Sequence, residues 1–129
     1  NIKLYQRVRD VAEPQAYEQF IQQKGIKLRR KLPGLHELSH GYHDIRFGYE
    51  DPYIGSCLKN VEAMGIYESV ERYNGRKQKH YALTNQQEYF AETTEAYFGK
   101  NDYWPFDRSQ LAQCDPQGLA MIRWAWGAP

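Results

Sequence analysis

The chain has 129 residues, a length typical of one domain that can bury roughly two-thirds of its unfolded surface. Its 17 basic and 16 acidic side chains nearly cancel, so charge gives no reason to expect nucleic acid or an anionic membrane as a partner. No apolar run approaches the length of a membrane-spanning helix, and we expect no membrane span.

The residues before position 33 predict one strand, one helix and a basic connection. Residues 2–11 alternate between apolar and polar side chains well enough for a strand. Residues 13–23 predict a helix with Pro14 in its first turn, where a missing backbone N–H is tolerated. The basic run at residues 27–31 is expected to be a solvated connection.

Residues 35–40 read Leu-His-Glu-Leu-Ser-His, an H-E-x-x-H motif that we expect near the start of a helix. His36 and His40 are four residues apart, so both imidazoles project from one helix face and can reach one metal ion. Glu37 is turned about 100° away from His36, where a general base for metal-activated water can stand. The expected core-facing stripe of this helix consists of Leu35, Leu38, Tyr42 and Ile45.

Two histidines do not complete a catalytic zinc site, which usually has three protein ligands and an open position. The metzincin pattern would need glycine at position 43 and histidine at position 46, but the chain has His43 and Arg46. The third ligand must therefore come from another part of the chain. We expect His43 to pack behind the ligands or to support them, rather than to bind the metal.

Two smaller elements are predicted between the motif and the next long helix. Residues 56–64 are expected to form a short helix. Residues 68–83 predict a hairpin that turns at Asn74-Gly75 with a type I′ geometry. The second strand of this hairpin would present Tyr81 near its end.

Residues 85–99 predict a second helix, which Thr84 or Asn85 can cap. Three glutamates, Glu88, Glu92 and Glu95, recur on it at helical spacing. Aligned like charges are unfavourable unless a cation faces them, so we expect Glu88 or Glu92 to serve the metal. The core-facing stripe of this helix is expected to be Phe90, Thr94, Tyr97 and Phe98.

The remainder predicts a loop and a final helix. Residues 101–106, which contain Trp104-Pro105, are expected to form the loop. Asp115 caps a helix that continues to the end of the apolar pattern. The expected inward-facing side chains of this helix are Leu119, Ile122 and Trp126.

The two motifs, in this order and at this distance, resemble those of gluzincin-type zinc metallopeptidases. The likeness rests on His-Glu-Leu-Ser-His at residues 36–40 and on the segment from Tyr81 to Glu92, which ends in Glu-Tyr-Phe-Ala-Glu. It extends to the catalytic domain of anthrax toxin lethal factor and to related secreted peptidases, and it runs from about Leu35 to Phe106. It implies an α+β, mainly helical, zincin-like domain with Zn²⁺ as its cofactor.

The resemblance also implies a role for each matching residue. Glu37 would act as the general base and Tyr81 would stabilise the oxyanion of the tetrahedral intermediate. Glu92 would accept a hydrogen bond from a ligand histidine and so fix its tautomer. The implied zinc ligands are His36, His40 and Glu88.

We therefore expect a zinc-dependent peptidase that acts on a peptide or protein substrate. Glu37 favours catalysis, because a purely structural zinc site does not need a carboxylate at that position. Two alternatives stay open: a zinc-stabilised interaction domain with little or no turnover, and a hydrolase of non-peptide amides.

The start of the chain and its cysteines bear on localisation and on the extent of the domain. The chain starts at Asn1, which is compatible with a processed secreted or periplasmic protein and does not exclude a cytoplasmic one. Cys57 and Cys114 can pair in an oxidising compartment, and the sequence leaves this pairing open. Gluzincin domains have a substrate-binding sheet before the metal helix. Because only about 34 residues precede the motif, we expect residues 1–129 to form a single domain whose substrate cleft is either abbreviated or completed by a missing N-terminal portion.

Overall fold

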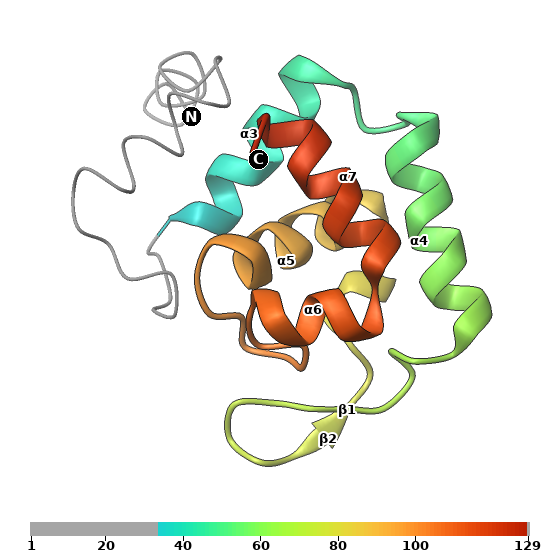
Figure 1. The fold of residues 1–129 in the computed structure, drawn as a ribbon, viewed down its shortest axis with the longest axis vertical. Helices are drawn as coiled ribbons and strands as arrows, with labels where there is room; N and C mark the ends of the chain where they lie inside the picture. The colour runs from blue at the N-terminus through green and yellow to red at the C-terminus, as the bar shows by residue number, and fades with distance from the viewer. Residues whose placement is uncertain (1–33, 129) are drawn as a thin grey trace.

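A computed structural model describes residues 34–128, so the strand, helix and connection expected before residue 32 lie outside the described residues (Figure 1). The described part is mainly helical with one small two-stranded sheet, which confirms the coarse fold class. No helix in this part is both long and apolar enough to cross a membrane. In chain order the elements are α3 (Leu35–Arg46), α4 (Pro52–Met64), β1 (Val70–Glu71), β2 (Lys77–Gln78), the 3₁₀ helix η1 (Tyr81–Leu83), α5 (Gln86–Phe98), α6 (Arg108–Cys114) and α7 (Pro116–Trp126).

Helix α5 is the centre of the fold, and α3, α4, α6, α7 and η1 all contact it (Figure 1). It begins where the sequence predicts, because the Asn85 side chain accepts a hydrogen bond from the Glu88 N–H at 2.9 Å. Every residue from 89 to 98 is buried, so the predicted core stripe is confirmed. The burial extends around the whole helix and includes Glu92 and Glu95.

Helix α3 is fixed against the C-terminal helix by an aromatic contact. The rings of Tyr42 and Trp126 stack with centroids 4.0 Å apart, a geometry worth about 1 kcal/mol beyond the buried area. The Tyr42 hydroxyl also donates to the Ala125 carbonyl oxygen at 2.6 Å, and Trp126 Nε1 donates to Thr94 Oγ1 at 3.2 Å. These contacts set the position of the metal-motif helix relative to α5 and α7.

The core-facing stripe of α3 is confirmed for three residues and wrong for the fourth. Leu35, Leu38 and Tyr42 are buried, but Ile45 is 53% exposed. Ile45 lies in the last turn of α3, where the chain leaves the helix. Phe47, just beyond the helix, is partly buried and packs against the core instead, with its ring centroid 5.7 Å from that of Tyr42.

One helix boundary differs from the sequence predictions, and one helix was not predicted. Helix α4 begins at Pro52 rather than at Ser56, because the Asp51 side chain accepts from the Ile54 N–H at 3.0 Å and proline suits the first helical position. Helix α6 is absent from the sequence predictions. It has only seven residues, and the Asp107 side chain caps it.

The predicted hairpin forms, but it is much shorter than expected. Strand β1 pairs antiparallel with β2, with Val70 opposite Gln78, and β2 ends there instead of continuing to residue 83. Gly75 has a φ of 83°, whereas Asn74 is not in the left-handed region. A type I′ turn needs positive φ at both central residues, so that prediction is wrong, and the five residues 72–76 connect the strands with Gly75 in the left-handed region.

The segment after the hairpin turns because of a buried histidine. His80 Nδ1 accepts from the Ala82 N–H at 3.0 Å, which caps η1. The His80 ring lies between Tyr67 and Tyr103, with centroids 4.4 and 4.9 Å away. Tyr81 is therefore the first residue of η1, and its predicted place at the end of a strand is wrong.

The two cysteines are free thiols in the structure, so the disulfide that the sequence left open is not formed. Cys57 is buried near the Gln117 carbonyl oxygen, and Cys114 lies against the Tyr67 hydroxyl. Burial is the main cause that raises the pKa of each thiol to about 11. Both thiols are therefore neutral and poorly nucleophilic near pH 7.

Candidate metal centre

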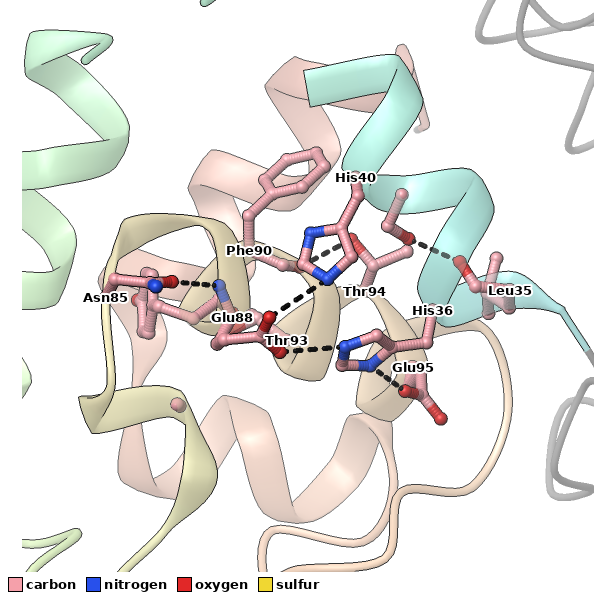
Figure 2. Close-up of polar contacts among 12 residues, drawn as sticks. Leu35, His36, His40, Asn85, Glu88, Phe90, Thr93, Thr94 and Glu95 are labelled. Atoms are coloured by element: carbon pink, nitrogen blue, oxygen red, sulfur yellow. Dashed lines mark hydrogen bonds and ion pairs between the residues drawn. The ribbon is translucent and has the colours of Figure 1, made fainter. Parts of the chain in front are cut away.

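The predicted ligand residues meet where α3 crosses α5. His36 and His40 project from α3 and Glu88 projects from α5, as Figure 2 shows. One Glu88 carboxylate oxygen lies 2.8 Å from His36 Nε2, and the other lies 3.1 Å from His40 Nε2. The structure thus brings together two imidazole nitrogens and one carboxylate from segments that are far apart in the sequence.

This group of three side chains fits a zinc ion. Zinc binds imidazole nitrogen and carboxylate oxygen at about 2.0–2.2 Å, so tetrahedral ligand atoms are about 3.3 Å apart. The nitrogen–oxygen distances of 2.8 and 3.1 Å therefore need to open by only a few tenths of an ångström. The side chains are 14–25% exposed, so solvent reaches this group of side chains.

Glu95 supports His36 from the other side of its ring. The Nδ1–H of His36 donates to Glu95 Oε1 at 2.6 Å, and Figure 2 shows the ring between Glu88 and Glu95. Seven residues are almost two full helical turns, so Glu88 and Glu95 point in nearly the same direction, whereas Glu92 is turned 40–60° from them, by about 100° per residue. Glu95 therefore makes the hydrogen bond to a ligand histidine that the resemblance implied for Glu92.

The carboxylates dominate the electrostatics of His36. Burial of the ring opposes its protonation, but Glu95, Glu92 and Glu88 together outweigh this effect and raise the pKa of His36 to about 9. The pKa of His40 is lowered, first by burial and then by the neighbouring His36, against the attraction of Glu88. The group as a whole favours a positive charge at His36, which is what a cation bound to Nε2 would supply.

Glu92 is buried without a complete set of partners. It is 6% exposed, and its Oε2 atom has no hydrogen-bond partner. Burial, followed by repulsion from Glu95, raises the pKa of Glu92 to about 7. The residue thus lies beside His36 as expected, but no hydrogen bond to a ligand histidine is found for it among the described residues.

A pocket of about 480 Å³ opens on the Glu95 side of His36. The two predicted catalytic residues, Glu37 and Tyr81, line this pocket together with the predicted ligand His36. Tyr81 is 45% exposed, and its ring centroid lies 6.4 Å from that of His36. The described residues that line the pocket are Gly34, His36, Glu37, Arg72, Tyr81, Glu92, Glu95, Asp102 and Tyr103.

His43 lies away from this cavity and packs in the interior. It is completely buried, its ring lies 4.7 Å from that of Phe90, and the Gln86 amide nitrogen donates to its Nε2 at 3.1 Å. Burial lowers the pKa of His43 to about 4, so the ring is neutral. The sequence left two roles open for His43, packing behind the ligands or supporting them, and these contacts agree with packing.

Four residues of the site were not assigned a role from the sequence: Glu95, Arg72, Asp102 and Tyr103. Glu95 could have been found, since it follows Glu88 by seven residues on a predicted helix. The other three come to the pocket through a contact that the sequence does not reveal, an isolated antiparallel bridge between Arg72 and Tyr103.

Comparisons of the chain with protein-family models, with curated proteins and with solved structures find no match.

Proposed function

We propose that the protein is a zinc-dependent peptidase whose metal is held by His36, His40 and Glu88. The observation that carries this proposal is the approach of both histidine Nε2 atoms to the two oxygens of one carboxylate. Zinc, when bound, would polarise the scissile carbonyl group and lower the pKa of water toward about 7. A gluzincin-like activity on peptide bonds is the chemistry that this set of residues supports best.

The residues around the ligands have separate tasks in this proposal. Glu37, exposed at the pocket, takes a proton from the attacking water and returns it to the leaving amine. The Tyr81 hydroxyl, in the same pocket, donates a hydrogen bond to the oxyanion as it forms. Glu95 holds the proton on His36 Nδ1, which keeps Nε2 available as a ligand atom.

The proposal is tested with Glu37→Gln, which removes the base without changing the size of the side chain. Cleavage of a peptide library by the zinc-loaded chain is followed by mass spectrometry, beside the metal content of each sample. We expect the variant to keep its zinc and to lose at least about 10²-fold in turnover, the usual contribution of a general base. Equal turnover in the variant would refute Glu37 as the base.

Zinc binding without cleavage of any peptide by the parent chain would support the alternative of a zinc-stabilised interaction domain. Cleavage of non-peptide amides alone would support the other alternative hydrolase.

A further inference from the structure

The pocket beside His36 carries an excess of negative charge. Four of the described residues that line it are carboxylic acids, and two, Arg72 and His36, are basic. A concave site with one dominant sign of charge concentrates ligands of the opposite sign. The four acids are Glu37, Glu92, Glu95 and Asp102.

Glu92 is the acid in this pocket that combines burial with an oxygen atom that lacks a hydrogen-bond partner. Glu95 already accepts the His36 Nδ1 proton, and Glu37 is exposed to water. Glu92 is 94% buried (6% exposed), and its Oε2 atom has no hydrogen-bond partner. A carboxyl group in such a place has lost hydration without a full replacement, so a cationic hydrogen-bond donor that reaches it would favour the ionised form and supply the missing hydrogen bond.

The walls of the pocket suit an ammonium group. Tyr81 and Tyr103 both line it, and aromatic faces attract cations. The Arg72 guanidinium lies 5.4 Å from the centroid of the Tyr103 ring, so this wall already contacts one cation. The Tyr81 ring, 45% exposed, is open to a second one.

A metal ion is the less suitable occupant. Nitrogen and oxygen atoms of His36, Glu92 and Glu95 lie close enough together to hold one. That ion would need Nδ1 of His36 as a ligand, and this atom carries the proton that Glu95 accepts at 2.6 Å. A protonated amine can bind Glu92 without disturbing this hydrogen bond.

We propose that this pocket binds a protonated amine of the peptide substrate, with Glu92 as the specificity-determining carboxylate that contacts it. The amine belongs either to a basic side chain or to the free N-terminus. The inference rests on the proposed function, because it names the substrate class of the same site. It predicts a preference for a positive charge next to the scissile bond.

The test measures binding by competition fluorescence anisotropy, with the zinc-loaded Glu37→Gln chain so that the probe is not hydrolysed. The probes are an alanine peptide with a central lysine, capped at both ends, and its norleucine isostere. A third probe, the norleucine peptide with a free N-terminus, distinguishes the two sources of the amine. At least one amine probe should bind about tenfold more tightly than the capped norleucine peptide, as expected for one charge-assisted hydrogen bond.

A second substitution, Glu92→Gln, should abolish this ratio. Glu62→Gln on the exposed surface of α4 removes the same charge elsewhere and should leave the ratio unchanged. A ratio near one in the parent chain overturns the inference, and this result holds even if Glu92→Gln does not fold. A ratio that survives in folded Glu92→Gln also overturns it.

Metal content separates the two proposals. A chain that takes up no zinc contradicts the proposed function, whereas the lysine preference of the metal-free chain still decides the inference, since the carboxylates do not depend on zinc. Two tightly bound zinc ions per chain, with the second lost in Glu92→Gln, would show that the pocket is a metal site and overturn the amine assignment.

Discussion

Glu95 should contribute more to zinc affinity than Glu92, although both are buried glutamates on the same helix. Glu95 Oε1 lies 2.6 Å from His36 Nδ1, while Glu92 Oε2 makes no hydrogen bond. Removing a carboxylate that orients a ligand histidine typically lowers metal affinity about 10–100-fold, or about 1.4–2.7 kcal/mol. The resemblance to known peptidases assigns this role to Glu92, so the two assignments make opposite predictions.

The size of the effect should depend on what replaces Glu95. In Glu95→Gln the amide oxygen can still accept from Nδ1–H, but a neutral acceptor forms roughly half as strong a bond, so we expect about a tenfold loss. Glu95→Ala leaves the nitrogen without a protein acceptor, so its loss should approach about 100-fold. Glu92→Gln removes a charge of the same sign without removing a hydrogen bond to His36, so it measures the electrostatic share alone.

The assay is competition with a chromophoric zinc chelator at fixed pH, after circular dichroism has shown that each variant is folded. We expect affinity to fall in the order parent chain, Glu92→Gln, Glu95→Gln, Glu95→Ala. An equal or larger loss in Glu92→Gln than in Glu95→Gln would refute the assignment of Glu95 as the residue that orients His36.

Three other predictions concern catalysis, packing and pH. Tyr81→Phe should lower kcat about 10²–10³-fold with unchanged zinc content, as for the loss of one oxyanion donor; an unchanged kcat would exclude this role. Gly118→Ala should destabilise the fold by about 2 kcal/mol in urea unfolding, although alanine favours helices by about 1 kcal/mol. The added Cβ would overlap Asp115 Oδ2 and lie 2.6 Å from the Tyr89 hydroxyl, which disrupts the α7 cap and a 2.6 Å hydrogen bond; equal or greater stability would contradict this. Burial lowers the pKa of His80 from about 6.5 in the unfolded chain to about 3 in the folded chain. Above about pH 6.5 neither state binds a proton at this ring, whereas between about pH 6.5 and pH 3 only the unfolded chain does. Between pH 7 and 5 the free energy of unfolding of the parent chain should therefore fall by about 2 kcal/mol more than that of His80→Asn, both measured with a chelator present. An equal fall in the two proteins would contradict this contribution of His80.

The sequence was sufficient where a local rule decides the structure. The four-residue spacing of His36 and His40 places both rings on one helix face whatever the tertiary fold. The capping side chains Asn85 and Asp115 likewise begin their helices as predicted, because a cap acts within three residues. The pairing of α3 with the glutamate helix also follows from the motif, since the two histidines leave a ligand position to fill.

The sequence was insufficient where the relative placement of two elements decides. Glu88, Glu92 and Glu95 fall within about 60° of one another on a helical projection. The way α3 crosses α5 determines that the His36 ring lies between the first and the last. The position of Tyr81 depends on His80, whose buried ring ends the extended segment by capping η1. Short elements such as α6 carry too few residues for a periodic pattern.

Metal content per chain is the measurement that tests the zinc site most directly. The purified protein is loaded with zinc, dialysed exhaustively and analysed for metals beside Glu88→Ala and the surface control Glu62→Ala. We predict about one zinc ion per chain in the parent and in the control, and a large loss in Glu88→Ala. A parent chain without zinc, or a Glu88→Ala variant that retains as much zinc as the control, would contradict a centre built from His36, His40 and Glu88.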